Sequence, residues 1–350
     1  MAWHVLLLGG GRMDLHMANR DIVAIGTSAG GVAALQYLAE RLPADFPACV
    51  LVTIHLSNQH RSVLDEVLSR AGPLPASFAS DGVQIRKGHI FIAPPDRHLI
   101  VENDRLLLGA GPRENNARPA IDAMLRSVAV CCGPRAIGVV LTGTLGDGAS
   151  GLRAISRCGG LSVVQHPDDA AFPQMPESAL RTMQPDHIAR LKDMPRLLAD
   201  LAQQPAGEPV AVPEQIGFEV EIAKTGRSDM GEMDRFGRRS VLACPDCHGV
   251  MWEIDEGGLT RYRCHLGHAY TGELMNVAVD ENLRRALASA IRALEEKVAL
   301  ARKLQREAAD RGHNLAQSTW AERASEYERE LNVVRDTVLR IEAAAAKAAE

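Results

Sequence analysis

The sequence predicts an α/β protein with a doubly wound, mostly parallel sheet, followed by a small Cys/His ribbon and an α-helical hairpin or coiled coil. In the first 200 residues, uninterrupted apolar runs alternate with helix-compatible segments, a pattern typical of a parallel sheet covered on both faces. Two short Cys/His motifs follow, and then an apolar repeat of helical period. The expected parts are a tail, an α/β domain, a linker, a ribbon and a helical region, at 1–20, 21–202, 203–240, 241–272 and 273–350.

The α/β domain is expected to hold short apolar strands and amphipathic helices in alternation. The strands lie at 22–25, 49–54, 90–93, 136–141 and 161–164, and a hairpin joins 99–101 to 106–108. The helices lie at 32–41, 62–70, 118–132, 149–157 and 176–183. Pro119 is expected near the first turn of its helix, where a missing N–H costs little.

The two C-terminal segments differ in composition. Residues 203–240 are rich in proline, glycine and charge, which predicts a loosely structured linker. From 273 onward, apolar residues follow steps of four and three, as at Trp320, Ala324 and Tyr327. This period of about 3.5 residues is typical of a helical hairpin or coiled coil. A homodimer through these helices, packing on the ribbon and docking to a helical partner all remain open.

Composition narrows the class of protein. Hydrophobic residues make up 46% and charged residues 24% of the 350 residues, and the net charge of −5 does not favour nucleic-acid binding. No apolar run is long enough for membrane insertion, and the first 20 residues lack the features of a signal peptide. They are expected to be a tail, or to precede a true start at Met13 or Met17 instead of Met1. The seven cysteines are not spaced as a disulfide framework, which favours a cytoplasmic protein.

A glycine turn containing one serine follows the first strand. Gly26 to Gly30 read G-x-S-x-G, the pattern of a nucleophile elbow, in which a sharp turn exposes a serine between a strand and a helix. Two other interpretations compete. Ser28 could be an ordinary helix N-cap, or the turn could be a dinucleotide fingerprint, although a serine replaces the middle glycine and no acid ends the second strand.

Two further residues occupy positions equivalent to that of Ser28. His55 directly follows the strand 49–54, and Asp147 lies in the glycine-rich loop after the strand 136–141. Because the carboxyl ends of parallel strands meet at one edge of the sheet, the three side chains are expected to lie together. A serine needs a base to accept its proton and an acid to orient that base. We therefore predict Ser28 as nucleophile, His55 as base and Asp147 as acid.

His98 is the rival base, but its place after a short strand and a proline turn favours a role in the wall of the cleft. Backbone N–H groups at Ala29, Gly30 and Gly31 are expected to hold an oxyanion at the helix start. An elbow on the first strand and the order Ser, His, Asp differ from the α/β-hydrolase fold.

Residues 21–185 resemble the catalytic domain of the chemotaxis-receptor methylesterases, the CheB family. The motifs that carry the resemblance are IGTSAGG, the strand-end His55, HIFIAPPDRHL, RPAIDAML, LTGTLGDGASGL and the Met175-Pro176 loop. The resemblance implies hydrolysis of γ-glutamyl methyl esters with release of methanol, deamidation of glutamine in some members, and no cofactor for catalysis. Its implied partner is a methylated helical receptor or signalling protein.

The resemblance also assigns site residues. It gives the triad roles to Ser28, His55 and Asp147, and an oxyanion or substrate-cleft role to Ala29, Gly30, Gly31, Thr144 and Met175. Ala29 and Thr144 stand where the family often has threonine and methionine, so backbone donors are expected to dominate. The short segment before the first strand implies a stand-alone branch without a receiver domain. The alternative is a catalytically weak binding or scaffold module in a chemosensory pathway.

The late cysteines predict a structural zinc site. Cys244 and Cys247 are separated by two residues, and Cys264 and His268 by three, a spacing that suits four-coordinate Cys3His binding. A segment this small has little core, so a metal would supply much of its folding free energy. His248 and His265 are rival ligands, and a reduced, unliganded pair of turns is the alternative.

Overall fold

Strand β1 (Ile22–Thr27) lies in the middle of a seven-stranded sheet in the computed structural model, which describes residues 19–55 and 62–348. The strand order is β3-β4-β2-β1-β7-β8-β9, and every neighbouring pair is parallel. The other strands of this sheet are β2 (Cys49–Ile54), β3 (Ala76–Phe78), β4 (Ile90–Ile92), β7 (Ala136–Val140), β8 (Leu161–Gln165) and β9 (His187–Ala189). The predicted fold class is confirmed. Nearly all of the predicted tail, including the three candidate start residues, lies outside the described residues.

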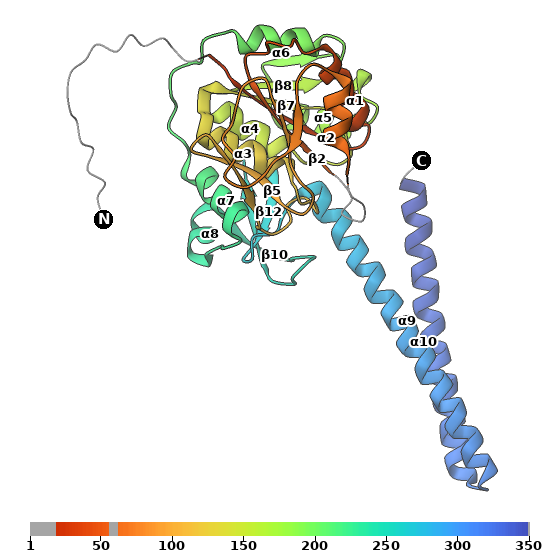
Figure 1. Cartoon of the computed structure of the whole chain (residues 1–350). Helices are drawn as coiled ribbons and strands as arrows, with labels where there is room; N and C mark the ends of the chain where they lie inside the picture. The colour runs from red at the N-terminus through yellow and green to blue at the C-terminus, as the bar shows by residue number, and fades with distance from the viewer. Residues whose placement is uncertain (1–18, 56–61, 349–350) are drawn as a thin grey trace. The chain divides into compact units, whose positions relative to one another are not determined.

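Helices cover both faces of this sheet (Figure 1). Alternate residues of β1 enter two separate cores, Ile22 and Ala24 on one face and Val23 and Ile25 on the other. The first core contains residues of α3 (Ile121–Cys132), α4 (Ala149–Arg157) and α5 (Gln174–Thr182). The second contains residues of α1 (Gly31–Arg41), α2 (Leu64–Ala71) and α6 (Met194–Ala202). A sheet buried on both faces explains why its strands are continuously apolar.

A few elements differ from the predictions. Helix α3 begins at Ile121, so Pro119 lies before its first turn. The edge strands β3 and β9 were not predicted, because each has only three residues and is incompletely buried. The predicted hairpin is present as β5 (His98–Glu102) and β6 (Arg105–Gly109), paired antiparallel.

The prediction of a loose linker at 203–240 is wrong from Glu214 onward. This range contains α7 (Glu214–Thr225) and α8 (Met230–Phe236). Helix α7 buries Ile216, Ile222 and Ala223, and it also buries Glu219. Because Glu219 lies on the buried face of α7, the sequence of this helix lacks a continuous apolar stripe and does not predict a packed helix.

The ribbon is a four-stranded antiparallel sheet in the order β10-β11-β12-β13. Its strands are β10 (Arg238–Ala243), β11 (Val250–Asp255), β12 (Thr260–Cys264) and β13 (Ala269–Thr271). The ribbon begins three residues before its predicted boundary. Its core includes the fully buried Trp252, which packs in one cluster with Ile222 of α7.

The last unit holds two long helices, α9 (Gly272–Asp310) and α10 (Asn314–Ala348). They run antiparallel, since Glu295 pairs with Arg335 and Arg302 pairs with Glu328, each at 2.5 Å. The predicted seam position Ala324 of α10 is buried. The helical hairpin is confirmed, and a homodimer through it stays a prediction. None of the described helices is both long enough and apolar enough to cross a membrane.

Candidate active site

Three polar side chains meet at the carboxyl edge of the central sheet. Strand β1 lies between β2 and β7. Ser28 follows the last residue of β1, His55 follows the last residue of β2, and Asp147 lies in the loop between β7 and α4. The strand order therefore brings together residues that are far apart in the sequence.

The three side chains form a hydrogen-bonded line. His55 Nε2 lies 2.8 Å from Asp147 Oδ2, and His55 Nδ1 lies 3.1 Å from Ser28 Oγ. A carboxylate only accepts hydrogen bonds, so Nε2 carries the imidazole proton and Nδ1 is left to accept from the serine hydroxyl. The His55 side chain is 24% exposed and that of Asp147 is 2% exposed. His55 thus faces solvent on one side, while Asp147 is fully enclosed.

Asp147 sits against the start of helix α3. Besides His55, its carboxylate accepts the backbone N–H groups of Ile121 at 2.7 Å and Asp122 at 3.1 Å, and the Asn115 amide at 2.9 Å. Burial by itself would raise the pKa of Asp147, but the hydrogen bond and charge of His55, with the other donors, outweigh burial and lower it. The carboxylate is therefore ionised and held in one orientation toward the imidazole.

The turn that carries Ser28 is fixed from the neighbouring strand. The Ser28 N–H donates to the Thr142 carbonyl at 3.0 Å, and the Thr142 hydroxyl donates to the Ala29 carbonyl at 3.0 Å. Gly30 has a φ of 76°, a left-handed conformation that glycine adopts at little cost, and α1 begins directly after it. The sharp turn leaves Ser28 half-buried at the carboxyl edge of the sheet.

The predicted oxyanion and cleft residues have different environments. The Gly31 N–H donates to the Ser28 carbonyl at 2.9 Å, so it is already engaged and is unsuited to hold an oxyanion. Within the described part of the chain, the N–H groups of Ala29 and Gly30 donate to no other residue. Thr144 is half-buried. Met175 is 1% exposed, so it lies behind the site and does not line an open cleft.

Gly143 is the reason why Met175 and the serine can pack together. A Cβ added at Gly143 would lie 2.1 Å from Met175 Sδ and 2.9 Å from Ser28 Cβ. No side chain fits between these two atoms. Gly143 lies inside the motif LTGTLGDGASGL, but no sequence pattern reveals this close approach, because Met175 and Ser28 are distant along the chain.

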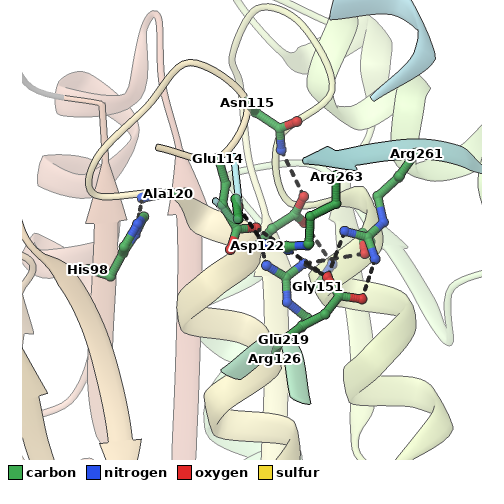
Figure 2. Close-up of polar contacts among 12 residues, drawn as sticks. His98, Glu114, Asn115, Ala120, Asp122, Arg126, Gly151, Glu219, Arg261 and Arg263 are labelled. Carbon is green, nitrogen blue, oxygen red and sulfur yellow. Dashed lines mark hydrogen bonds and ion pairs between the residues drawn. The ribbon is translucent and has the colours of Figure 1, made fainter. Parts of the chain in front are cut away.

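The rival base His98 is a structural residue. It is fully buried, its Nε2–H donates to the Pro112 carbonyl at 2.9 Å, and its Nδ1 accepts the Ala120 N–H at 3.2 Å. Figure 2 shows the His98 ring directed at Ala120. Burial lowers the pKa of His98, so the ring is neutral. With both nitrogens engaged, His98 anchors the segment before α3 and does not compete with His55.

The four predicted metal ligands also lie together. The donor atoms of Cys244, Cys247, Cys264 and His268 are all within 4.8 Å of one another. His268 Nδ1 lies 3.7 Å from Cys244 Sγ and 3.5 Å from Cys264 Sγ, and Cys247 Sγ lies 3.6 Å from Cys264 Sγ. A tetrahedral ion with ordinary zinc bond lengths would separate its sulfur ligands by about 3.8 Å and sulfur from nitrogen by about 3.6 Å. The rival ligands His248 and His265 are not part of this cluster.

Comparison with known proteins agrees with this geometry. The chain matches the CheB methylesterase family over residues 23–198. This chain belongs to the CheB methylesterase family. The matched range contains the seven strands of the central sheet, apart from the first residue of β1, and the three residues of the hydrogen-bonded line.

Relatives of this CheB family chain share the catalytic domain. A Leptospira interrogans protein, named provisionally as a protein-glutamate methylesterase/protein-glutamine glutaminase, is 32% identical over 53% of this chain and 96% of its own length. A protein-glutamate methylesterase/protein-glutamine glutaminase of Geobacter sulfurreducens is 37% identical over 50% of this chain, but only 48% of that relative is covered. The crystal structure of the Thermotoga maritima CheB methylesterase catalytic domain superposes with a TM-score of 0.51 at 29% identity, over 53% of this chain and 100% of that domain.

Proposed function

We propose that the protein is a serine hydrolase that cleaves γ-glutamyl methyl esters on a protein. The line from Asp147 through His55 to Ser28, at the edge of a CheB methylesterase domain, is the observation that carries this proposal. A buried, ionised acid fixes the imidazole tautomer, and the free imidazole nitrogen lies within reach of the serine hydroxyl. The proposed catalytic residues all come from the part of the chain shared with the relatives.

The proposed reaction has two matched halves. Ser28 Oγ attacks the ester carbonyl while His55 Nδ1 accepts its proton, and the imidazolium then protonates the departing methoxide, which leaves as methanol. Water next attacks the acyl-enzyme, again with His55 as base, and the glutamate side chain is released with the serine hydroxyl restored. Asp147 stays ionised throughout and stabilises the imidazolium. No cofactor enters either half.

Backbone N–H groups of Ala29 and Gly30 are the proposed donors for the tetrahedral oxyanion. They stand beside Ser28 at the start of helix α1, where the helix dipole also favours negative charge. Removing a single oxyanion donor in a serine hydrolase typically lowers kcat by about 10² to 10³. Backbone donors are insensitive to the Ala29 and Thr144 substitutions noted in the sequence.

The proposed substrate is a methylated helical receptor or signalling protein, with deamidation of glutamine at equivalent positions as a second activity. The relatives are named for both activities on protein side chains. The same acyl-enzyme accounts for both, since ammonia from an amide replaces methanol from an ester as the leaving group. A methyl ester is the easier substrate because methoxide needs less help to leave than an amide nitrogen.

The proposal is tested with one helical peptide in two forms, carrying either a glutamyl methyl ester or a glutamine at the same position. The full chain should release methanol from the first form well above the spontaneous rate, and ammonia from the second form more slowly. A peptide of the same composition with its helix broken by proline is the matched control. Methanol release no faster than in buffer, from protein with a cooperative melting transition, would contradict the proposal.

We also propose that the Cys/His cluster holds a structural zinc ion. Three thiolates and one imidazole nitrogen are the ligand set of many closed zinc sites, and the spacing of the donor atoms suits a tetrahedral ion. With four protein ligands there is no open position for substrate. The ion would therefore stabilise the ribbon and take no part in ester chemistry.

A further inference from the structure

Asn115 connects the triad acid to the ribbon. It lies in the loop between β6 and α3, is 8% exposed, and uses every polar atom of its side chain. Its amide nitrogen donates to Asp122 Oδ2 at 2.8 Å and to Asp147 Oδ1 at 2.9 Å. Its amide oxygen accepts the N–H of Thr271 at 3.1 Å. One side chain thus contacts two carboxylates on one side and a ribbon strand on the other.

The ribbon strand that holds Asn115 comes directly after a predicted metal ligand. The Asn115 N–H donates to the Ala269 carbonyl at 2.7 Å, so strand β13 contacts this residue through both its backbone and its side chain. Ala269 is the next residue after His268. A continuous path of one peptide bond and hydrogen bonds therefore runs from the Cys/His cluster to Asp147 and on to His55.

The two carboxylates explain why the amide matters. Asp122 and Asp147 are both buried, and neither forms an ion pair with an arginine within the described residues. Burial, and then the nearby charge of Asp147, raises the pKa of Asp122 to about 7. The Asn115 amide places one N–H on each carboxylate and adds no charge. Without it, each carboxylate would lose a donor and their repulsion would be less well compensated.

The ribbon is fixed firmly enough to act as a support. Its strand β12 buries Arg261 and Arg263, and Figure 2 shows both guanidinium groups directed at Glu219 of α7. Arg263 also pairs with Glu114, the residue before Asn115, at 3.1 Å, and Glu114 pairs with Arg126 of α3. Since all of these side chains are buried, their charges are poorly screened and hold the ribbon, the loop and α3 in one arrangement.

We propose that Asn115 is a positioning residue through which the metal-binding ribbon sets the orientation of Asp147, so that loss of metal from the ribbon lowers esterase activity. The ion itself stays away from the reacting atoms. This inference rests on the proposed esterase function and on the proposed zinc site. If the inference is correct, the ribbon supports catalysis although it contributes no residue to the triad.

Asn115→Ala and Asn116→Ala in the full chain form a matched pair. Both residues have left-handed backbones, with φ of 50° and 61°, so either replacement brings the same backbone strain, but Asn116 is exposed. Asn115→Ala should lower kcat for the methyl ester by about 10- to 100-fold, the usual cost of losing an orienting partner, with KM changed less than about twofold. Asn116→Ala should retain wild-type kcat and KM. Asn115→Asp keeps the shape and tolerates the same φ but replaces the donor with an acceptor, and should be at least as impaired as Asn115→Ala.

The metal is tested in the same assay with zinc as the probe. Chelation of the wild type should reduce kcat and zinc content together, and added zinc should restore both, while kcat of Asn115→Ala should change much less on chelation. Equal kcat for Asn115→Ala and Asn116→Ala, or full kcat in zinc-free protein, would overturn the inference. If instead the wild type releases no methanol at all, the proposed esterase function fails, which is a separate result.

Discussion

The backbone N–H of Ile121 donates to Asp147 Oδ2 at 2.7 Å, so the proposed catalytic acid also caps helix α3. The helix has no cap from its own N-cap residue, Ala120. A carboxylate at this position meets the unpaired N–H groups and the positive end of the helix dipole. The Asp147 side chain therefore supports both the fold and the proposed chemistry. Mutations at the site should differ in whether they lower stability as well as activity.

The first prediction contrasts Asp147→Ala with Ser28→Ala. Asp147→Ala removes the cap and should lower the free energy of unfolding by about 1–2 kcal/mol, as well as lowering kcat by about 10³ to 10⁴. Ser28→Ala should abolish activity but leave stability nearly unchanged, because Ser28 is held by its backbone. Urea unfolding of both variants measures the difference. Equal stability of the two would show that Asp147 does not cap α3.

The second prediction concerns the pH dependence of stability. Because the pKa of Asp122 in the folded protein is about 7 against an ordinary value of 3.8, the folded state binds more protons than the unfolded chain between these values. This residue's contribution therefore favours folding at low pH and is lost as the pH rises to about 7. The difference in unfolding free energy between wild type and Asp122→Asn should fall over this range and be flat above it. A difference independent of pH would contradict the raised pKa.

The third prediction tests the buried ion network that docks the ribbon. Glu219 accepts from Arg261 at 2.6 and 2.9 Å and from Arg263 at 2.6 Å. Glu219→Gln would leave two buried guanidinium groups poorly compensated and should destabilise the protein by about 3–5 kcal/mol. Glu221→Gln on the same helix is the control, since Glu221 is 56% exposed and should change stability by less than about 0.5 kcal/mol. Thermal unfolding of both variants measures the two losses of stability. Similar small losses for Glu219→Gln and Glu221→Gln would mean that the network contributes little.

The fourth prediction is that purified protein carries about one zinc ion per chain. Cys247→Ser removes one of the four donors and should lower the zinc content to well below one. Cys131→Ser, at the end of α3 and outside the cluster, should keep the metal. Elemental analysis after extensive dialysis provides the measurement. Full zinc in Cys247→Ser would place the metal elsewhere.

The sequence predicted the fold where strands are continuously apolar and where polar residues follow them directly. Ser28 and His55 follow the last residues of β1 and β2, so their proximity depends only on strand order. Helix α7 could not be predicted in this way, because its buried Glu219 looks like a solvent-exposed charge until its arginine partners on β12 are known.

The role of Asn115 could not be predicted from the sequence either. Its partners Asp147 and Thr271 are 32 and 156 residues away along the chain, and no local pattern links them. The Cys/His ligands were recognisable because metal binding demands a fixed spacing within each pair. A single hydrogen-bonding amide demands none, so only the docked ribbon reveals what Asn115 contacts.

The central claim is that Ser28 is the nucleophile of a glutamyl methylesterase. The most direct test compares methanol release from the methylated helical peptide by the wild type and by Ser28→Ala, at equal concentrations of folded protein. We predict rapid release by the wild type and release at the spontaneous rate with Ser28→Ala. Equal rates above the spontaneous rate for the two proteins would contradict the assignment of Ser28.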